Sequence, residues 1–394
     1  MLMYDAIIVG ARCAGAATAM LLSRRGHRVL LVDRATFPSD LPHGHFLHRR
    51  GPARLKRWGL LGRMAATGAP PITSVVSDYG DFPLSDRDIM VEGAPLGYGP
   101  RRRALDKILL DAAIEAGAEL RCGFAVQDYI GDGGRITGIR GREAAGRTVV
   151  TEHAKVIIGA DGRNSRLART VAAPTYEELP PLTCWYFSYW SGIPDPGLRV
   201  YLRDRRLLLA FPADAGLVAV FAAWPAPMLP RIRADIPGHF MQAVDAVPEL
   251  REQVRAGRQE DRFYGASDLP NFLRRPYGPG WALVGDAGCH KDPFLALGMC
   301  DAFRDAELLT NALDEAFTGL LPLEAALAGY HRKRDRSTLP DYRLNALLAR
   351  TMAAPEALLR LRAEARGDPA STRRLMLREQ GVRETDASYL EAVS

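Results

Sequence analysis

Residues 6–15 read Ala6-Ile7-Ile8-Val9-Gly10-Ala11-Arg12-Cys13-Ala14-Gly15, an apolar run that stops abruptly at a glycine-containing turn. The residues after this turn have the spacing of a helix, which Gly26 ends. A second apolar run, residues 28–32, leads into Asp33. Strand, tight turn, helix and strand in this order form one half of a doubly wound parallel sheet. The stretch therefore predicts an α/β fold that starts with a Rossmann-like nucleotide-binding unit.

The turn departs from the G-x-G-x-x-G pattern of dinucleotide-binding units at its middle glycine. Gly10 supplies the tight turn and Gly15 lets the helix pack closely, but Arg12 occupies the position where the backbone normally approaches the phosphates. Either Arg12 turns its side chain outward, or its guanidinium binds the cofactor. Asp33 lies where a carboxylate accepts hydrogen bonds from ribose hydroxyls and repels a 2′-phosphate. The candidate cofactor contacts here are Gly10, Arg12, Cys13, Ala14, Gly15, Asp33 and Arg34.

Two later stretches repeat this design of a buried strand that ends at a Gly/Asp turn. Residues 156–162 end in Asp161-Gly162, and residues 281–287 contain Gly285-Asp286. An Asp-Gly pair by itself is also an ordinary turn. Three such elements in one chain, however, predict a binding site for a dinucleotide, and their combination indicates FAD.

The third stretch carries additional chemistry. Asp286 follows a strand, where a carboxylate can hold a polyol such as ribitol, and Pro293 makes the next loop rigid. Gly298 then opens a helix. The free N–H groups at a helix N-terminus stabilise the negative charge that a reduced flavin carries near N1 and O2. His290 and Lys291 could equally be solvated loop residues.

The composition limits the number of domains, the partners and the cellular compartment that we expect. The chain has 394 residues, 47% of them hydrophobic, which suits a large core and two or three domains. Its net charge of +6 is not accompanied by a basic and aromatic module, so we expect no nucleic-acid partner. Five cysteines without CxxC spacing argue against a metal site and favour a reducing cytoplasm. No apolar segment reaches the roughly 20 residues of a transmembrane helix. The oligomeric state stays open.

The pattern of elements divides the chain into three parts. A discontinuous FAD-binding domain takes residues 1–72, 97–172 and 262–330, and an antiparallel β-sheet domain for the substrate takes residues 73–96 and 173–261. Residues 331–394 form a helical C-terminal region with an uninformative polar end. We further expect helices over residues 15–25, 51–64, 101–117, 238–256, 298–316 and 323–366, and turns at residues 131–134 and near Gly146.

The chain resembles the FAD-dependent monooxygenases of the p-hydroxybenzoate hydroxylase fold, a superfamily that includes flavin-dependent halogenases and geranylgeranyl reductases. The resemblance rests on the first turn with Asp33, on the two later Gly/Asp motifs, and on Arg102 in an Arg-x-x-Leu-Asp pattern. It covers roughly residues 4–330 and leaves the C-terminal tail out.

The resemblance implies further cofactor contacts. Arg102 and the backbone near Val126 would contact FAD, Asp161 would lie near the pyrophosphate and the route of the nicotinamide donor, and Asp286 would bind the ribityl chain or pyrophosphate. NAD(P)H would dock transiently as the reductant, without a second fingerprint of its own. The candidate contacts in these parts of the chain are Arg102, Val126, Asp161, Gly162, Gly285, Asp286, Pro293, Gly298 and Met299.

The implied reaction is hydroxylation of an aromatic or polycyclic small molecule through a flavin C4a-hydroperoxide. The flavin supplies the reactivity, so the protein needs a dry, shaped pocket rather than a catalytic triad. The candidate catalytic residues are His45, His290 and Pro293, and the candidate substrate contacts are His48, Tyr98, Trp185, Tyr189, Phe211 and Trp224. Each aromatic side chain could instead belong to the core. Alternation along a strand puts Trp185, Phe187 and Tyr189 on one face and Tyr186 and Trp190 on the other, so only one set can face the pocket.

Three other functions remain open at this stage. A halogenase would carry Trp-x-Trp-x-Ile-Pro, of which only Ile193-Pro194 remains in register, and no catalytic lysine is apparent. A C=C reductase of geranylgeranyl reductase type is favoured by Phe211-Pro212 in a similar strand, and the basic C-terminal helices would then suit peripheral membrane contact or simply form a solvated face. A non-redox protein that binds FAD structurally is the third alternative.

Overall fold

The computed structural model describes residues 3–39, 44–143 and 148–380. Its first half is built on a sheet in the order β19-β20-β10-β1-β2-β7, in which the central strands are parallel. Val9 lies level with Gly159, and Gly159 lies level with Leu283, so the three Gly/Asp turns meet at one edge. The strands are β1 (Tyr4–Val9), β2 (Val29–Asp33), β7 (Glu119–Cys122), β10 (Val149–Gly159), β19 (Tyr277–Gly278) and β20 (Trp281–Leu283).

Helices cover this sheet much as the spacing predicts. The helices α1 (Cys13–Ser23), α4 (Arg102–Glu115) and α9 (Gly298–Phe317) pack together, and their buried residues share one core with β1 and β2. The expected helix over residues 51–64 is instead two short helices, α2 (Gly51–Arg57) and α3 (Leu61–Ala65), because Gly59 adopts a φ of +76° between them. The first half of β10 forms a ribbon with β8 (Phe124–Asp132) and β9 (Arg135–Glu143), which turns at residues 133–134 as expected. The turn expected near Gly146 lies outside the described residues.

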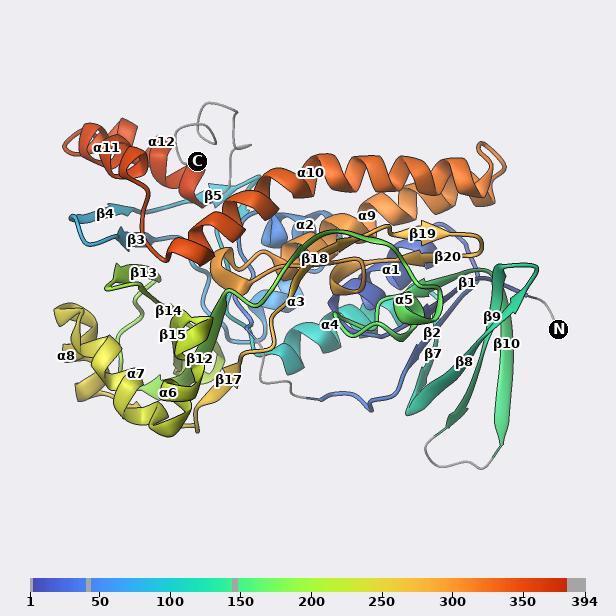
Figure 1. The fold of residues 1–394 in the computed structure, drawn as a ribbon, viewed down its shortest axis with the longest axis horizontal. Helices are drawn as coiled ribbons and strands as arrows, with labels where there is room; N and C mark the ends of the chain where they lie inside the picture. The colour runs from blue at the N-terminus through green and yellow to red at the C-terminus, as the bar shows by residue number, and fades with distance from the viewer. Residues whose placement is uncertain (1–2, 40–43, 144–147, 381–394) are drawn as a thin grey trace.

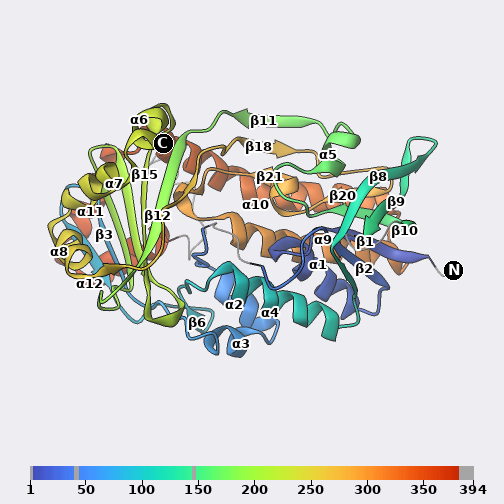
Figure 2. The ribbon, with the colours of Figure 1, turned by 90° about the horizontal axis from the view of Figure 1, so that it is seen from below.

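A second sheet, which we call the substrate sheet, has the order β16-β12-β15-β14-β13-β3-β4 and is antiparallel except where β13 meets β3. Its inner face looks toward the nucleotide-binding half, and α6, α7 and α8 cover its outer face (Figure 2). The strands are β3 (Val75–Asp78), β4 (Pro83–Asp86), β12 (Thr183–Ser191), β13 (Leu198–Arg203), β14 (Arg206–Pro212), β15 (Val218–Pro225), β16 (Arg258–Gln259) and the added β17 (Tyr264–Ala266). The helices are α6 (Leu229–Ala234), α7 (Ile236–Asp245) and α8 (Pro248–Ala256).

Two sets of elements join the halves. A small sheet of β11 (Thr175–Leu179), β18 (Asn271–Arg274) and β21 (Cys289–His290) lies between them (Figure 2). The long helix α10 (Leu323–Thr351) runs beside α9 and reaches the substrate sheet (Figure 1). Smaller elements complete the chain: α5 (Arg166–Thr170), the pair β5 (Met90–Val91) and β6 (Ala94–Pro95), and short 3-10 turns at residues 214–216, 226–228, 285–287 and 293–295.

The C-terminal region differs from the expectation of one helical run over residues 323–366. Met352 adopts a left-handed φ of +46° and ends α10, so α11 (Glu356–Ala365) is a separate helix. A further helix, α12 (Pro369–Glu379), forms in the stretch that looked uninformative, where the Asp368 carboxylate caps it by accepting from the backbone N–H groups of Ala370 and Ser371. Within the described ranges, no helix combines the length and the apolar character that crossing a membrane requires.

Candidate flavin and substrate site

The first turn requires both of its glycines. Gly10 has a φ of +108°, and a Cβ atom there would lie 2.3 Å from the carbonyl oxygen of Ala160. A Cβ atom on Gly15 would lie 1.7 Å from the carbonyl oxygen of Gly10. These separations are far below any real carbon contact, so the start of α1 can approach β1 and β10 only because both side chains are absent. The roles that the sequence gives to the two glycines match this packing.

Arg12 has polar contacts with two other side chains. Its guanidinium forms an ion pair with Asp106 on α4 at 2.6 Å and donates to Ser39 Oγ at 2.9 Å. Asp106 is almost fully buried and also accepts from Arg102 at 3.0 Å. This ion pair joins the turn to α4, a contact that the sequence did not indicate, and both alternatives for the role of Arg12 stay open.

Asp33 stabilises the same turn through backbone contacts. One carboxylate oxygen accepts from the N–H of Ala11 and the other from the N–H of Ala35, both at 2.8 Å. Each oxygen keeps a second lone pair, so hydrogen bonds to ribose hydroxyls stay available. Arg34, beside it, is exposed.

The second motif is a strand end closed by a short helix. Asp161 Oδ2 accepts from the N–H of Arg166, while its Oδ1 is buried with no hydrogen-bond partner among the described residues. Gly162 has a φ of +77°, which favours glycine. The carbonyl oxygen of Val126 accepts from the Arg166 guanidinium at 3.2 Å, so that carbonyl already has a partner.

The third motif forms a cradle between two helices. Gly285 has a φ of +62°, and a Cβ atom there would lie 2.8 Å from Cβ of Ala14 on α1. Asp286 Oδ1 would lie 3.9 Å from a Cβ placed on Gly298, so this carboxylate stands beside the first turn of α9. Gly298 is exposed and Met299 half-buried, which leaves the first turn of α9 accessible.

The cradle fits a flavin cofactor. The buried guanidinium of Arg102 is near enough to Asp286 for the carboxylate to raise its pKa further, and its Nε atom has no hydrogen-bond partner among the described residues. An unpartnered buried donor of this kind is costly unless a ligand uses it. The accessible helix N-terminus, the Asp286 carboxylate and the Arg102 Nε together suit the polar, partly anionic edge of a flavin.

The loop that follows, residues 289–297, is fixed by buried polar side chains. Asp292 accepts from the N–H and the hydroxyl of Thr183 at 3.1 and 2.7 Å. Asn345 on α10 accepts from the N–H of Leu295 at 2.9 Å, and Asn271 accepts from the N–H of Asp292 at 2.7 Å. Pro293 follows Asp292 in a short 3-10 turn. Thr183, Asn271 and Asn345 could not be identified from the sequence, because their roles depend on elements far apart in the chain.

His290 and Lys291 are buried rather than solvated. The His290 Nδ1 atom is hydrogen bonded to the carbonyl oxygen of Pro270. Lys291 forms an ion pair with Asp301 on α9, which Arg304 also contacts at 2.7 Å. Burial alone would raise the pKa of Asp301, but the charges of Arg304 and Lys291 lower it to about 2. The structure thus gives both residues interactions that hold the loop, and it does not bring His290 together with His45.

The inner face of the substrate sheet gathers aromatic rings around His45. Its imidazole is 1% exposed, and the ring centroids of Tyr189 and Phe211 lie 5.5 and 5.4 Å away. Phe187 and Phe221 lie at 6.0 and 5.9 Å. Of these four rings, Phe221 was missed by the sequence analysis, although it pairs with Phe187 across β12 and β15.

Other candidate substrate residues have different positions. Trp185 shares the inner-face cluster with Tyr189, whereas Trp224 belongs to the outer-face cluster beneath α7 and α8. The register explains this, since Trp224 pairs with Cys184 and Ala223 pairs with Trp185. Trp224 is therefore not brought together with the other candidates. Tyr98 is buried in the core of the nucleotide-binding half.

The sequence analysis also did not identify Arg101 as a residue of the inner sheet face. Its guanidinium lies 4.5 Å from the ring centroid of Tyr189 and 3.5 Å from Asp214. A guanidinium over the face of a tyrosine ring is attracted by the ring quadrupole. It links the start of α4 to the inner face of the substrate sheet.

His48 contacts the loop that precedes α9. Its Nε2 atom lies 3.0 and 3.1 Å from the carbonyl oxygens of Leu295 and Ala296. Ala296 adopts a left-handed φ of +52°, which an L-residue reaches only at a cost in energy. Burial lowers the pKa of His48 to about 3, so the imidazole is neutral at physiological pH.

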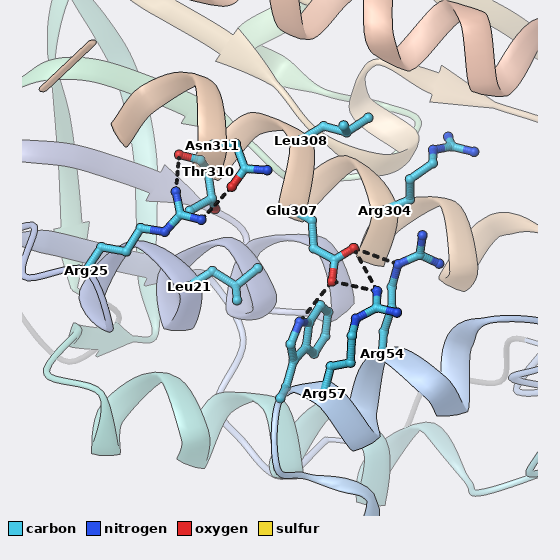
Figure 3. A pocket seen from close by; sticks show the side chains of 10 residues that line it. Leu21, Arg25, Arg54, Arg57, Arg304, Glu307, Leu308, Thr310 and Asn311 are labelled. Carbon is cyan, nitrogen blue, oxygen red and sulfur yellow. Dashed lines mark hydrogen bonds and ion pairs between the residues drawn. The ribbon is translucent and has the colours of Figure 1, made fainter. Parts of the chain in front are cut away.

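A separate hollow of about 450 Å³ lies away from the cradle, among α1, α2 and α9. Four arginines line it, and Glu307 on α9 accepts from Arg54 at 2.9 Å and from Arg57 at 3.1 Å (Figure 3). Arg25 and Arg304 bond to other side chains, namely Asn311 and Asp301. The arginines of this hollow thus bond to protein side chains. Across the residues that the structure describes, no three His, Cys, Asp or Glu side chains are grouped to hold a metal ion.

Comparison with known proteins finds similar flavin enzymes. Residues 3–186 match the FAD binding domain family. The chain is 26% identical to squalene epoxidase 3 of Arabidopsis thaliana, over 79% of this chain and 60% of the plant enzyme's length. It is 28% identical to digeranylgeranylglycerophospholipid reductase 1 of Methanopyrus kandleri, over 75% of this chain and 76% of that enzyme.

Solved structures show the same fold at lower identity. The flavin-dependent brominase Bmp2 superposes with a TM-score of 0.81 at 18% identity, covering 99% of this chain and 96% of the brominase. Pseudomonas aeruginosa PqsL in complex with 2-aminobenzoylacetate gives 0.77 at 22% identity, covering 89% and 98% of the two chains. Similarity at this level shows the fold alone.

The fold and the match of residues 3–186 to the FAD binding domain family define the class: this is a flavoprotein, similar to the members of the superfamily that contains these monooxygenases, halogenases and geranylgeranyl reductases. The chain is a flavin-dependent oxidoreductase with FAD as its cofactor.

Proposed function

We propose that the chain is an NAD(P)H-using monooxygenase that hydroxylates an apolar aromatic or polycyclic molecule. In the net reaction, R–H, O₂, NAD(P)H and a proton give R–OH, water and NAD(P)⁺. The observation that carries this proposal is the buried aromatic surface around His45, formed by Phe187, Tyr189, Phe211 and Phe221. Such a surface suits the face of an aromatic substrate and excludes water from it.

The residues of the cradle would hold FAD and stabilise its charge. When bound, FAD supplies hydride acceptance from NAD(P)H and the activation of O₂. Asp286 would hold its ribityl chain, and the N-terminus of α9 would stabilise negative charge on the reduced ring. Arg102 would donate through its free Nε atom. The loop of residues 289–297, fixed by Asp292, would keep this edge rigid.

The lysines of the chain argue against a halogenase. A halogenase stayed open from the sequence although no catalytic lysine was apparent in it, and the positions of the lysines support the monooxygenase instead. Lys291 is buried in its ion pair with Asp301. Lys56, Lys107 and Lys155 are bonded at the surface of the nucleotide-binding half, and Lys333 lies on α10.

A second candidate function is a flavin-dependent C=C reductase of geranylgeranyl reductase type. The observation that favours it is the apolar cavity between the inner sheet face and the C-terminal helices, which would also suit a prenyl chain. In this case a C=C bond would accept a hydride and a proton, and O₂ would not take part.

The experiment that separates the candidates measures oxygen. We expect the FAD-loaded protein to oxidise NADPH or NADH faster when an aromatic substrate is added, with O₂ uptake and hydroxylated product in equal amounts. A panel of phenols, quinolones and polycyclic phenols provides the substrates. Turnover of a prenyl alkene under strict anaerobiosis would instead replace the monooxygenase proposal with the reductase, and dependence on bromide or chloride would replace it with a halogenase.

A further inference from the structure

A cavity of about 80 Å³ lies between the inner face of the substrate sheet, the loop before α9 and the C-terminal helices. Figure 2 shows α10, α11 and α12 beside that sheet. The side chains that line the cavity are mostly apolar, and they include Leu198, Val200, Leu207, Leu209, Phe294 and Leu358. A cavity of this size and lining suits a small ring or a short apolar chain.

His48 lines the cavity, and its Nδ1 atom has no hydrogen-bond partner among the described residues. Both atoms that face Nε2 are carbonyl oxygens, so Nε2 must carry the proton and donate it to Leu295 and Ala296. The neutral ring then has its lone pair on Nδ1. This atom is buried and has no hydrogen-bond partner among the described residues. The ring is 5% exposed, so bulk water does not satisfy it either.

Arg49, the next residue, also has a buried polar atom without a hydrogen-bond partner among the described residues. Arg49 lines the cavity too, and its Nη1 atom pairs with Asp341 at 3.1 Å. Its Nε atom is buried with no hydrogen-bond partner among the described residues. Two consecutive residues that line a mostly apolar cavity therefore have one acceptor and one donor without a partner among the described residues. A hydroxyl group both donates and accepts, and it matches this pair.

We propose that this cavity binds the hydroxyl-bearing end of an apolar substrate, with His48 Nδ1 accepting a hydrogen bond from the hydroxyl group. The inference rests on the proposed function, because it assigns part of the substrate of that oxidoreductase. It makes His48 a specificity-determining residue: the bonds from Nε2 fix the tautomer, and Nδ1 selects a phenol or alcohol over a hydrocarbon of the same shape. The carboxylate of Glu379 also lies in the cavity wall, but it already accepts hydrogen bonds from Ser77 and Tyr79.

The test compares two probes of equal shape, 4-ethylphenol and 4-ethyltoluene, by equilibrium dialysis against the FAD-loaded protein. We expect His48→Gln to weaken the binding of 4-ethylphenol about tenfold, the effect of one hydrogen bond, and to leave 4-ethyltoluene unchanged. Gln can still donate to the two loop carbonyls but lacks the Nδ1 acceptor. His48→Asn, which restores an acceptor near Nδ1, should recover part of the phenol preference.

A second variant checks whether the probes bind in this cavity. Leu358→Trp on α11 should fill the cavity and abolish binding of both probes while FAD content stays at the wild-type level. The proposal is overturned if neither probe binds the wild-type holoprotein, if His48→Gln keeps the full phenol preference, or if Leu358→Trp binds both probes normally. Dialysis needs no turnover, so failure of the monooxygenase proposal appears separately in the oxygen measurement.

Discussion

At the scale of single residues, Asp286 is the proposed cofactor contact with the most specific surroundings. It stands beside the first turn of α9, and its charge acts on the buried guanidinium of Arg102. No other carboxylate of the described Gly/Asp motifs has this position between a helix N-terminus and a buried cation. The sequence indicated the carboxylate and the helix start, but not the approach of Arg102 from α4.

We predict that Asp286→Ala weakens FAD binding about ten- to a hundredfold, because it removes one or two charge-assisted hydrogen bonds. Flavin absorbance of the purified and dialysed protein measures this directly. Asp132→Ala is the matched control, since Asp132 is an exposed aspartate in the β8–β9 turn. Equal flavin content in the two variants would remove Asp286 from the cofactor site.

At the scale of elements, Glu307 joins α9 to α2. Its carboxylate accepts from Arg54, from Arg57 and from the indole N–H of Trp58, all within 3.1 Å. The Arg54 side chain is only 12% exposed, so its charge depends on this partner. By contrast, Glu92 pairs with Arg57 and Arg50 at the surface, where water competes for each charge.

We predict that Glu307→Gln lowers the free energy of unfolding by about 1–3 kcal/mol, since it leaves a half-buried cation without its counter-charge. Glu92→Gln should cost at most about 1 kcal/mol. Urea denaturation of the FAD-loaded variants, followed by tryptophan fluorescence, gives both values. If Glu92→Gln proved the more damaging change, α9 and α2 would not be joined in this way.

Over the whole molecule, a buried arginine is one of the groups that attach the C-terminal helices to the substrate sheet. Arg362 on α11 is one of the basic residues of the C-terminal helices, but its side chain is fully buried. It bonds to Asp81 at 2.9 Å, to Ser77 Oγ at 2.9 Å and to Glu379 of α12 at 3.3 Å. The alternatives of a membrane patch or a solvated face therefore do not apply to this residue.

We predict that Arg362→Met releases α11 and α12, because the carboxylates of Asp81 and Glu379 lose their buried counter-charge at a cost of about 3–5 kcal/mol. Hydrogen exchange should accelerate across residues 356–379 and β3, and it should stay slow in β1 and β10. Arg360→Met, an exposed change on the same helix, should leave exchange as in the wild type. Unchanged protection in the Arg362 variant would contradict this account.

Local physics explains what the sequence by itself determined. A strand must end where Gly10 or Gly162 takes a positive φ, and Gly15 must lack a side chain, so these positions and the α/β fold are readable from the chain alone. The tertiary structure alone decided which distant groups meet. Trp224 faces away from the pocket because of strand register, Arg12 finds Asp106 because α4 packs beside α1, and His48 reaches the loop before α9. Such contacts join residues many positions apart, and only the packing of whole elements brings them within bonding distance.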